Sequence, residues 1–141
     1  MKISKFVLMS TMVAISLVSC KTAEQGLAIP QEPLEECVYK GGRTEFSVWA
    51  PTAEAAQLKL YKSASDQEAF MTVDMKLGKD GLWKTVVREK LKGSFYTFQI
   101  KNNGQWLPET AGIAAKAVGV NGWRGAVIDW DDTDPKGWDD D

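Results

Sequence analysis

The chain has 141 residues, with 17 Lys and Arg, 19 Asp and Glu, two Cys, six Trp and no His. This length suits one domain, with room for a tail. Without histidine, Ser-His-Asp and Cys-His nucleophile systems and imidazole-bound zinc are excluded, and two cysteines cannot form an all-thiolate zinc site. The formal net charge of −2 argues against a general nucleic-acid binder. We therefore expect no cofactor, no metal and no nucleic-acid partner.

The first nineteen residues are typical of a secretory signal. Lys2 and Lys5 form a basic start, and a mostly apolar run covers 6–18, which is too short to span a bilayer as a helix. The run ends at 17–20 (LVSC), which resembles the lipobox of bacterial lipoproteins. In those proteins the signal is cut before the cysteine, and the cysteine is acylated. The alternative is an ordinary signal with a chance cysteine.

Acylation of Cys20 would decide the location of the protein. Each buried methylene of an acyl chain contributes about 0.8 kcal/mol, so several chains hold a protein firmly on a membrane. Lys21, rather than Asp, follows the cysteine, and the usual sorting rule for such lipoproteins then favours the outer membrane. Which face of that membrane is occupied stays open. We expect a lipid-anchored protein of the bacterial cell envelope.

Cleavage after residue 19 would remove Lys2 and Lys5 and no acid, which changes the formal net charge from −2 to −4 (15 basic and 19 acidic residues). It would also leave Cys37 without a partner if Cys20 carries lipid. We expect Cys37 to be a small, partly buried apolar residue. A reactive thiol is the alternative, but the chain has no histidine to activate it.

The rest of the chain divides into a tether and a strand-rich region. Residues 20–37 contain Pro30 and Pro33 and show no strong periodicity, so we expect a tether. From residue 38 on, short alternating segments are separated by turn signals such as Asp80-Gly81 and Asn103-Gly104. The expected strands are 44–49, 56–60, 71–77, 82–87, 95–100, 106–107 and 125–128. Seven short strands at this spacing predict an all-β, antiparallel β-sandwich over 38–129, and the one helix candidate, 113–118, is short.

The C-terminal residues are strongly acidic. Residues 129–141 hold seven acids and one base. A calcium loop is one interpretation, but the central glycine and distal glutamate of an EF-hand are missing and Pro135 interrupts the segment. A solvated acidic linker over 130–141 is the preferred one. Gly119, Gly122 and Gly125 favour turns over a phosphate cradle, which would need a strand before them and a helix after.

Several stretches together resemble a known family. Residues 46–53 (FSVWAPTA) are similar to the opening strand of the N-terminal domain shared by isoamylases, branching enzymes and pullulanases, which is carbohydrate-binding module family 48. Residues 80–83 (DGLW) and 93–98 (GSFYTF) are similar to its middle strands. Residues 115–129 (AKAVGVNGWRGAVID), continued by 133–138 (TDPKGW), resemble the segment just before the catalytic barrel of type I pullulanases. The resemblance covers about 38–141 and implies an immunoglobulin-like sandwich.

The resemblance also sets expectations about activity. In pullulanases the chain continues into a glycoside hydrolase family 13 barrel, which cleaves α-1,6-glucosidic bonds. Such hydrolysis needs a positioned carboxylate pair, and that barrel also uses histidines around the sugar, which this chain lacks. We therefore expect no catalytic residues and no hydrolase activity from this chain alone. The possible partners are an α-glucan such as starch, pullulan or maltooligosaccharide, the catalytic barrel, and a membrane through the lipid anchor.

The tryptophans divide by position. Trp49 and Trp83 lie within expected strands, where we expect core residues. Trp106 ends the turn 103–106 (NGQW), which resembles the turn of glycogen-binding family members whose tryptophan stacks on glucan. Those members commonly carry a lysine where this chain has Thr97, which puts their full site in doubt.

The remaining tryptophans lie in the C-terminal part of the chain. Trp123 follows an expected turn, where an exposed contact role is the alternative to packing. We expect Trp130 and Trp138 to be interdomain contacts near a barrel. Three functions remain open: a non-catalytic glucan-binding module of a pullulanase-like lipoprotein, a purely structural docking domain, and a stand-alone surface glycan-binding lipoprotein.

Overall fold

The computed structural model describes residues 29–30 and 32–133, so the predicted sites at Cys20 and Trp138 lie outside the described residues. The described part of the chain forms nine strands and two short 3-10 helices. In chain order these are β1 Cys37–Lys40, β2 Arg43–Trp49, β3 Ala55–Tyr61, β4 Met71–Asp74, β5 Lys76–Leu77, β6 Leu82–Val87, β7 Phe95–Asn102, β8 Gln105–Trp106, η1 Val120–Gly122, β9 Gly125–Ala126 and η2 Trp130–Asp132.

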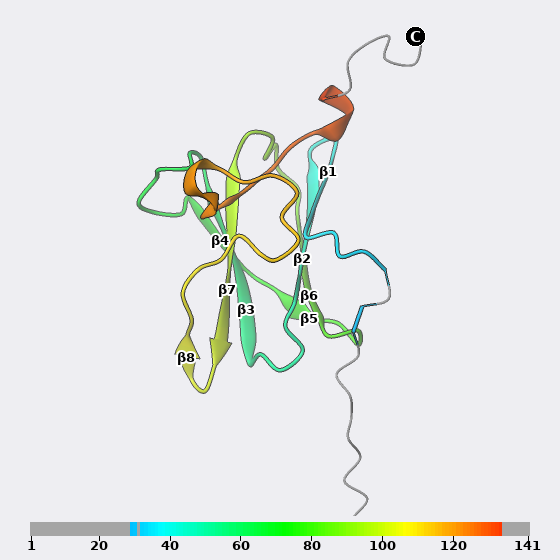
Figure 1. Cartoon of the computed structure of the whole chain (residues 1–141), viewed down its shortest axis with the longest axis vertical. Coiled ribbons are helices and arrows are strands. Elements are labelled where there is room, and N and C mark those ends of the chain that lie inside the picture. Colours follow the sequence, from blue (N-terminus) through cyan, green and yellow to red (C-terminus); the bar gives the residue numbers. More distant parts are fainter. Residues whose placement is uncertain (1–28, 31, 134–141) are drawn as a thin grey trace, which may run out of the picture.

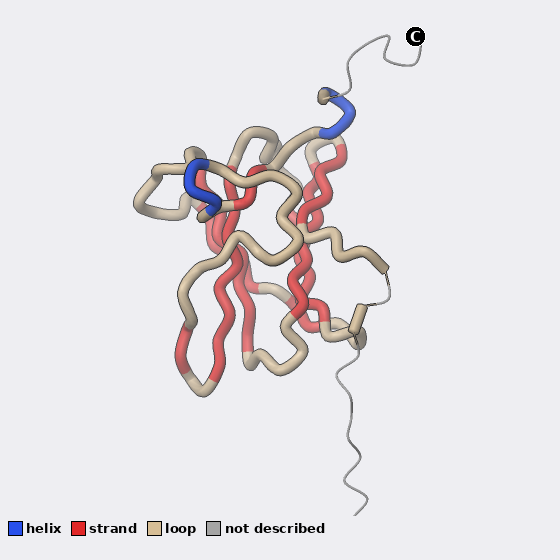
Figure 2. The backbone as a smooth tube through the Cα atoms, in the orientation of Figure 1, coloured by secondary structure: helices blue, strands red, loops and turns tan. Residues whose placement is uncertain are grey.

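The strands make two antiparallel sheets that face each other (Figures 1 and 2). Sheet A has the order β1-β2-β6-β5, and sheet B has the order β4-β3-β7-β8, with β9 also paired to β7. In Figure 1, β2, β5 and β6 stand beside β3 and β7, and the segment after β8 crosses in front of them. The all-β, immunoglobulin-like antiparallel sandwich is therefore confirmed.

Side-chain alternation places the core between the two sheets. Phe46 and Val48 of β2 face Leu58, Tyr96 and Phe98 of sheet B, and all five are at most 5% exposed. The rings of Phe46 and Tyr96 meet edge to face across the sandwich, with centroids 5.3 Å apart, a geometry that aromatic pairs prefer. This contact ties one sheet to the other at the centre of the core.

Three other expected core residues can be placed. Trp83 is 8% exposed, and its Nε1 donates to the carbonyl oxygen of Ala50 at 2.9 Å, which confirms it as a core residue. Trp49, at the end of the neighbouring strand, is half-buried. Cys37 is also half-buried, and burial raises the pKa of its thiol to about 12, which agrees with the expected apolar role.

The expected strand 71–77 is two strands in two different sheets. β4 pairs with β3 in sheet B, whereas β5 pairs with β6 in sheet A. Met75 lies between them, 5% exposed, with its amide still bonded to Ala56 of sheet B at 2.9 Å. Apolar residues occupy every second position from 71 to 77. The sequence pattern therefore gives no sign that the chain changes sheets at Met75.

The segment 113–118, the one expected helix, is irregular: the amide of Ala126 in β9 donates to the carbonyl oxygen of Ala117 at 2.9 Å, and Val118 forms a bridge with Gly125. The start of the segment is held by a buried carboxylate. Glu36 is 1% exposed and accepts hydrogen bonds from the amides of Ile113 and Ala114, each at 3.0 Å. Burial raises the pKa of Glu36, and these two bonds only partly offset that effect. Gly112 has a φ of +95°, and a Cβ there would lie 2.1 Å from the Glu36 carboxylate. Glu36 thus fixes the start of this segment, while its end pairs with the strand β9.

The same contact fixes the residues just before β1. Glu35 forms an ion pair with Lys116 at 2.6 Å, and the amide of Ser47 donates to the carbonyl oxygen of Glu36 at 3.0 Å. The predicted tether 20–37 therefore ends in residues that the fold holds in place, and β1 itself begins at Cys37.

We expect Glu36→Ala to lower the free energy of unfolding by about 2–4 kcal/mol, because it removes the acceptor of two part-buried backbone amides. Glu35→Ala is the matched control: its ion pair is about half exposed and should contribute less than about 1 kcal/mol. Urea unfolding of both variants measures the difference. Equal losses would contradict this role of Glu36.

A second prediction concerns Thr44, whose hydroxyl is buried and has no hydrogen-bond partner among the described residues. Replacing it with the isosteric Val should raise the free energy of unfolding by about 1 kcal/mol, because an unsatisfied hydroxyl is costly to bury. Thr44→Ser, which keeps the hydroxyl and loses a methyl group, should lower it. A Val variant less stable than the parent would show that the hydroxyl is satisfied.

Candidate functional site

The outward-facing side of sheet B is polar and follows directly from the strand register. In β3 and β7 the residues that alternate with the core point outward. Gln57 lies opposite Gln99, and Lys59 lies opposite Thr97. The two glutamines are hydrogen-bonded at 2.7 Å, and Gln99 also donates to the carbonyl oxygen of Leu107 at 3.0 Å. We call this surface the sheet B face.

Trp106 lies at one end of the sheet B face. The turn between β7 and β8 has Asn103 at φ 50° and Gly104 at φ 73°, the positive angles that a tight two-residue hairpin requires. This hairpin places Trp106 opposite Lys101, whose Nζ lies 6.0 Å from the centroid of the indole ring. Trp106 is 42% exposed, so part of its ring is available to a ligand.

A carboxylate network occupies the middle of the face. Glu109 accepts hydrogen bonds from Lys59 at 2.8 Å, from the Tyr61 hydroxyl at 2.5 Å and from the Thr97 hydroxyl at 2.7 Å. Burial acts to raise the pKa of Glu109, but these three bonds outweigh it and hold the pKa below its usual value. Thr97 carries no charge, but Lys59 lies directly opposite it and brings a cation to the same level of the sheet.

Trp123 lies toward the other end of the face and is 76% exposed. It borders two hollows, one of about 310 Å³ that it shares with Thr97 and Glu109, and one of about 300 Å³ that it shares with Ala64 and Val120. The turn before it has Asn121 at φ 66° and Gly122 at φ 68°, as the Asn-Gly pair predicts.

Arg124 fixes the backbone that carries Trp123. Its guanidinium lies 3.5 Å from the centroid of the Tyr61 ring, a cation–π contact. It also donates to the carbonyl oxygens of Ser63 at 2.9 Å and Asp66 at 2.5 Å. Tyr61 is consequently 3% exposed although it belongs to the outward-pointing set. Because these contacts hold Arg124, they also fix the backbone position of Trp123, the residue before it in the chain.

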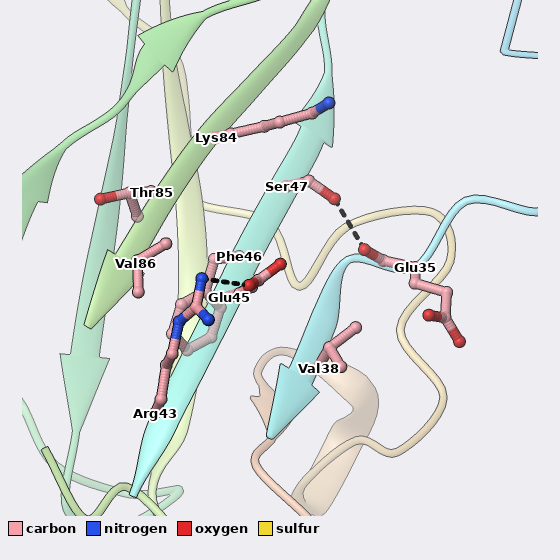
Figure 3. Close-up of a pocket in the computed structure, with 9 residues that line it drawn as sticks. All are labelled: Glu35, Val38, Arg43, Glu45, Phe46, Ser47, Lys84, Thr85 and Val86. Carbon is pink, nitrogen blue, oxygen red and sulfur yellow. Dashed lines mark hydrogen bonds and ion pairs between the residues drawn. The ribbon is translucent and has the colours of Figure 1, made fainter. Parts of the chain in front are cut away.

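The outward side of sheet A has a different character (Figure 3). Its hollow of about 270 Å³ is lined by residues that include Val38, Lys84 and Val86. Figure 3 shows Ser47 donating to the Glu35 carbonyl oxygen at 2.6 Å and Arg43 paired with Glu45 at 2.5 Å. The one aromatic residue in its lining, Phe46, is 1% exposed. This hollow thus offers no flat ring to a ligand.

The structure brings two of the predicted site residues to one face, and a third, Trp130, lies in a different element. Trp106 and Trp123 both border the sheet B face. Trp130 lies in η2, is 47% exposed and is followed by Asp132, which pairs with Lys92. No group of three or more His, Cys, Asp or Glu that could hold a metal ion occurs in the described part of the chain.

Three residues of the site were not predicted. Lys59 could have been found, because it points outward in the alternating segment 56–60 and aligns with 95–100. Glu109 and Arg124 lie in segments without periodicity, and no sequence signal places them near Lys59 or Tyr61.

Among the helices that the structure describes, none is long and apolar enough to cross a membrane.

Comparison with known proteins gives a consistent result. Residues 31–116 match the family Carbohydrate-binding module 48 (Isoamylase N-terminal domain). A pullulanase from Bacillus subtilis (strain 168) is 38% identical over 91 residues, which are 64% of this chain and 12% of that protein. The apo pullulanase from Paenibacillus barengoltzii has a TM-score of 0.74 and 36% identity, over 82% of this chain and 17% of its own.

Two further solved structures extend the comparison. The pullulanase from Bacillus acidopullulyticus has a TM-score of 0.74 and 33% identity, over 82% of this chain and 14% of its own. A Paenibacillus barengoltzii pullulanase in complex with maltohexaose and α-cyclodextrin also has a TM-score of 0.74. This chain therefore spans 12% to 18% of the length of these relatives.

The Glu109 network predicts a pH effect. Because its folded-state pKa lies below the ordinary value of 4.5, the charged carboxylate stabilises the fold above that value, and this stabilisation is lost as the pH falls through the folded-state pKa. Glu109→Gln should be less stable than the parent at pH 7, and the difference should shrink as the pH falls below 4.5. Thermal unfolding across this range checks it. A difference that stays constant with pH would contradict it.

Proposed function

The chain belongs to the carbohydrate-binding module 48 family (isoamylase N-terminal domain), and from this membership we propose that it binds starch-type α-glucan as the non-catalytic module of a pullulanase-like protein. The observation that carries the proposal is the sheet B face, where two exposed tryptophans border one polar surface. The parent protein would hydrolyse α-1,6-glucosidic bonds through a barrel of the glycoside hydrolase family 13 type.

The face suits a sugar chain because it combines rings with fixed polar groups. The flat side of a pyranose ring is apolar and packs on an indole, while hydroxyl groups need donors and acceptors at its edge. Lys101 beside Trp106 and the amide of Gln99 supply such groups. Glu109 does not suit the role of a general acid: its oxygens accept three hydrogen bonds, and its lowered pKa favours the ionised form, whereas that role in glycosidic cleavage needs a protonated carboxyl group.

A second candidate function is docking against the catalytic barrel. Several exposed apolar side chains lie in the C-terminal part of the sequence. They include Ile113 at 86%, Val118 at 51%, Val120 at 77%, Trp123 at 76% and Trp130 at 47% exposed. Where such residues form one contiguous patch, they are typical of a contact surface. Under this reading Trp130, together with Trp138, would contact the barrel, and the domain would have a structural role.

Trp106→Ala separates the two functions. Loss of roughly 60 Å² of indole face against sugar should cost about 1.5 kcal/mol, which is about a tenfold fall in affinity for soluble starch. Trp130→Ala, an exposed tryptophan outside the face, is the matched control and should bind as the parent does. Calorimetric titration measures both variants. Absence of binding by the parent at millimolar maltooligosaccharide would contradict glucan binding and favour docking.

We also propose that residues 1–19 are a signal peptide and that Cys20 carries the lipid that anchors the module in the bacterial envelope, at the outer membrane. The support is the lipobox-like 17–20 segment after an apolar run. A stand-alone surface glycan-binding lipoprotein would use the same anchor.

Metabolic labelling with a fatty acid tests the anchor. The parent should take up label, and Cys20→Ala should not, because the lipid would be attached at Cys20. Cys37→Ala is the control and should label as the parent does. Label retained in Cys20→Ala would contradict the proposal.

A further inference from the structure

We propose that the acidic C-terminal residues 134–141 fold back onto their own module and bind a basic surface at one end of sheet A. We call this surface the basic rim, and its members are Lys40, Arg43, Arg88, Lys90 and Lys92. The inference concerns a surface other than the sheet B face and does not depend on glucan binding. It makes the segment after η2 a bound part of the module, whereas the sequence favoured a solvated linker.

The strand register brings the members of the basic rim to the same end of sheet A. Lys40 and Arg43 pair across the turn between β1 and β2. Thr44 and Val87 form the last pair of β2 with β6, so the next residue of that chain, Arg88, follows beside the turn. In Figure 1 this turn, the loop between β6 and β7 and η2 all lie at the upper end of the view.

One buried side chain directs the cations of the second loop outward. Leu91 is 1% exposed, whereas Lys90 and Lys92 on either side of it are exposed. The amide of Ser94 donates to the carbonyl oxygen of Leu91 at 2.8 Å, which closes the loop before β7 begins. The loop therefore presents its charged side chains from a backbone that is already held in place, which lowers the ordering cost of binding.

The charge of the basic rim is only partly neutralised within the described structure. Arg43 pairs with Glu45, and Lys92 pairs with Asp132. None of the ion pairs among the described residues includes the other three members of the rim, although Glu89 lies in the same loop. Clustered charges of one sign raise the local concentration of an oppositely charged group. The rim therefore favours an acidic occupant.

The acidic segment begins at this surface. The pair of Lys92 with Asp132 already joins η2 to the rim, and the amide and hydroxyl of Thr133 both donate to the carbonyl oxygen of Trp130, at 3.0 and 2.8 Å. Residues 134–141 hold four acids and one base, with three consecutive acids at 139–141. Six extended residues reach about 20 Å, whereas neighbouring strands are only about 5 Å apart. These acids can thus reach the rim from η2.

A hollow beside the rim suits the residue that precedes the three acids. Figure 3 shows Val38, Arg43 and Val86 around this hollow of about 270 Å³ on the outward side of sheet A. Val86 is 43% exposed and lies two residues before Arg88, which is about 7 Å along a strand. Trp138 directly precedes the acids at 139–141. Binding of these acids to the rim brings its indole to the exposed valine, where burial of apolar surface favours the contact.

Nitrogen-15 NMR of the full chain at low salt tests the contact. Replacing the three acids at 139–141 together with Asn should shift the amide signals of Arg43, Arg88 and Lys90, because each loses a neighbouring negative charge. The amide of Lys79, an exposed cation before β6 at the opposite end of sheet A, should not shift. Raising the salt from about 0.01 M to about 1 M shortens the Debye length from about 30 Å to about 3 Å, and the difference between variant and parent should then disappear.

Charge reversal separates a direct contact from an effect of net charge. In the parent, a soluble nitroxide should broaden the Trp138 indole N–H signal less than that of Trp123, which is 76% exposed. Arg88→Glu combined with Lys90→Glu should abolish this protection, and adding Lys in place of the three acids at 139–141 should restore it. The matched control, Lys76→Glu with Lys79→Glu, changes the net charge equally and should leave Trp138 protected. Thermal unfolding confirms that each variant is folded.

Two results would overturn the inference. If the rim signals do not respond to loss of the three acids at low salt, and Trp138 is broadened as strongly as Trp123, the segment is a solvated linker. If the shifts weaken on dilution, the acids bind the rim of a second copy and not their own module. Either result leaves the proposed glucan binding on the sheet B face untouched.

Discussion

The antiparallel pairing of β3 with β7 is the constraint on which the rest of the module depends. Its register runs from Ala55 opposite Lys101 to Tyr61 opposite Phe95. It places Leu58 and Phe98, both 0% exposed, side by side in the core. The next pair along the two strands, Lys59 and Thr97, points to the opposite side of the sheet. A slip of one residue would exchange these two sets, so burial of the core and the order of polar groups on the outer face are one and the same constraint.

The edges of β7 then determine where the aromatic rings lie. One edge is taken by β3, and the other is shared by the hairpin strand β8, the bridge at Thr110 and the short strand β9. Trp106 enters through the hairpin, and Trp123 enters through the segment that leads into β9. The buried carboxylate of Glu36 holds the loop between them at Ile113 and Ala114. The path from one tryptophan to the other is thus fixed by long-range contacts.

Much of the fold could be predicted from the sequence because its causes are local. Alternation located the strands, and the pairs Asp80-Gly81 and Asn103-Gly104 located turns whose glycines have positive φ. The errors arose where a distant residue decides. The crossing at Met75 is defined by pairing with two different strands, β3 and β6. The segment 113–118 pairs with β9 at Val118 and is held at its start by Glu36, about 77 positions away.

The same distinction holds for the site. Both exposed tryptophans follow turn signals and could be named from the sequence, whereas Glu109 and Arg124 became visible only through their contacts with Tyr61, which lies about 50 and 60 residues away in the chain. Family membership explains the similarity of this module to parts of pullulanases, and the outer face of sheet B is the surface that we propose for sugar binding.

The most direct test of this account is a map of the contact surface by nitrogen-15 NMR during titration with maltoheptaose. The account predicts shifts of the Trp106 and Trp123 indole N–H signals and of the Gln99 side-chain amide. The amides of Thr85 and Val86, on the outward side of sheet A, should stay unchanged. Shifts confined to sheet A, or none on the sheet B face at saturating sugar, would contradict it.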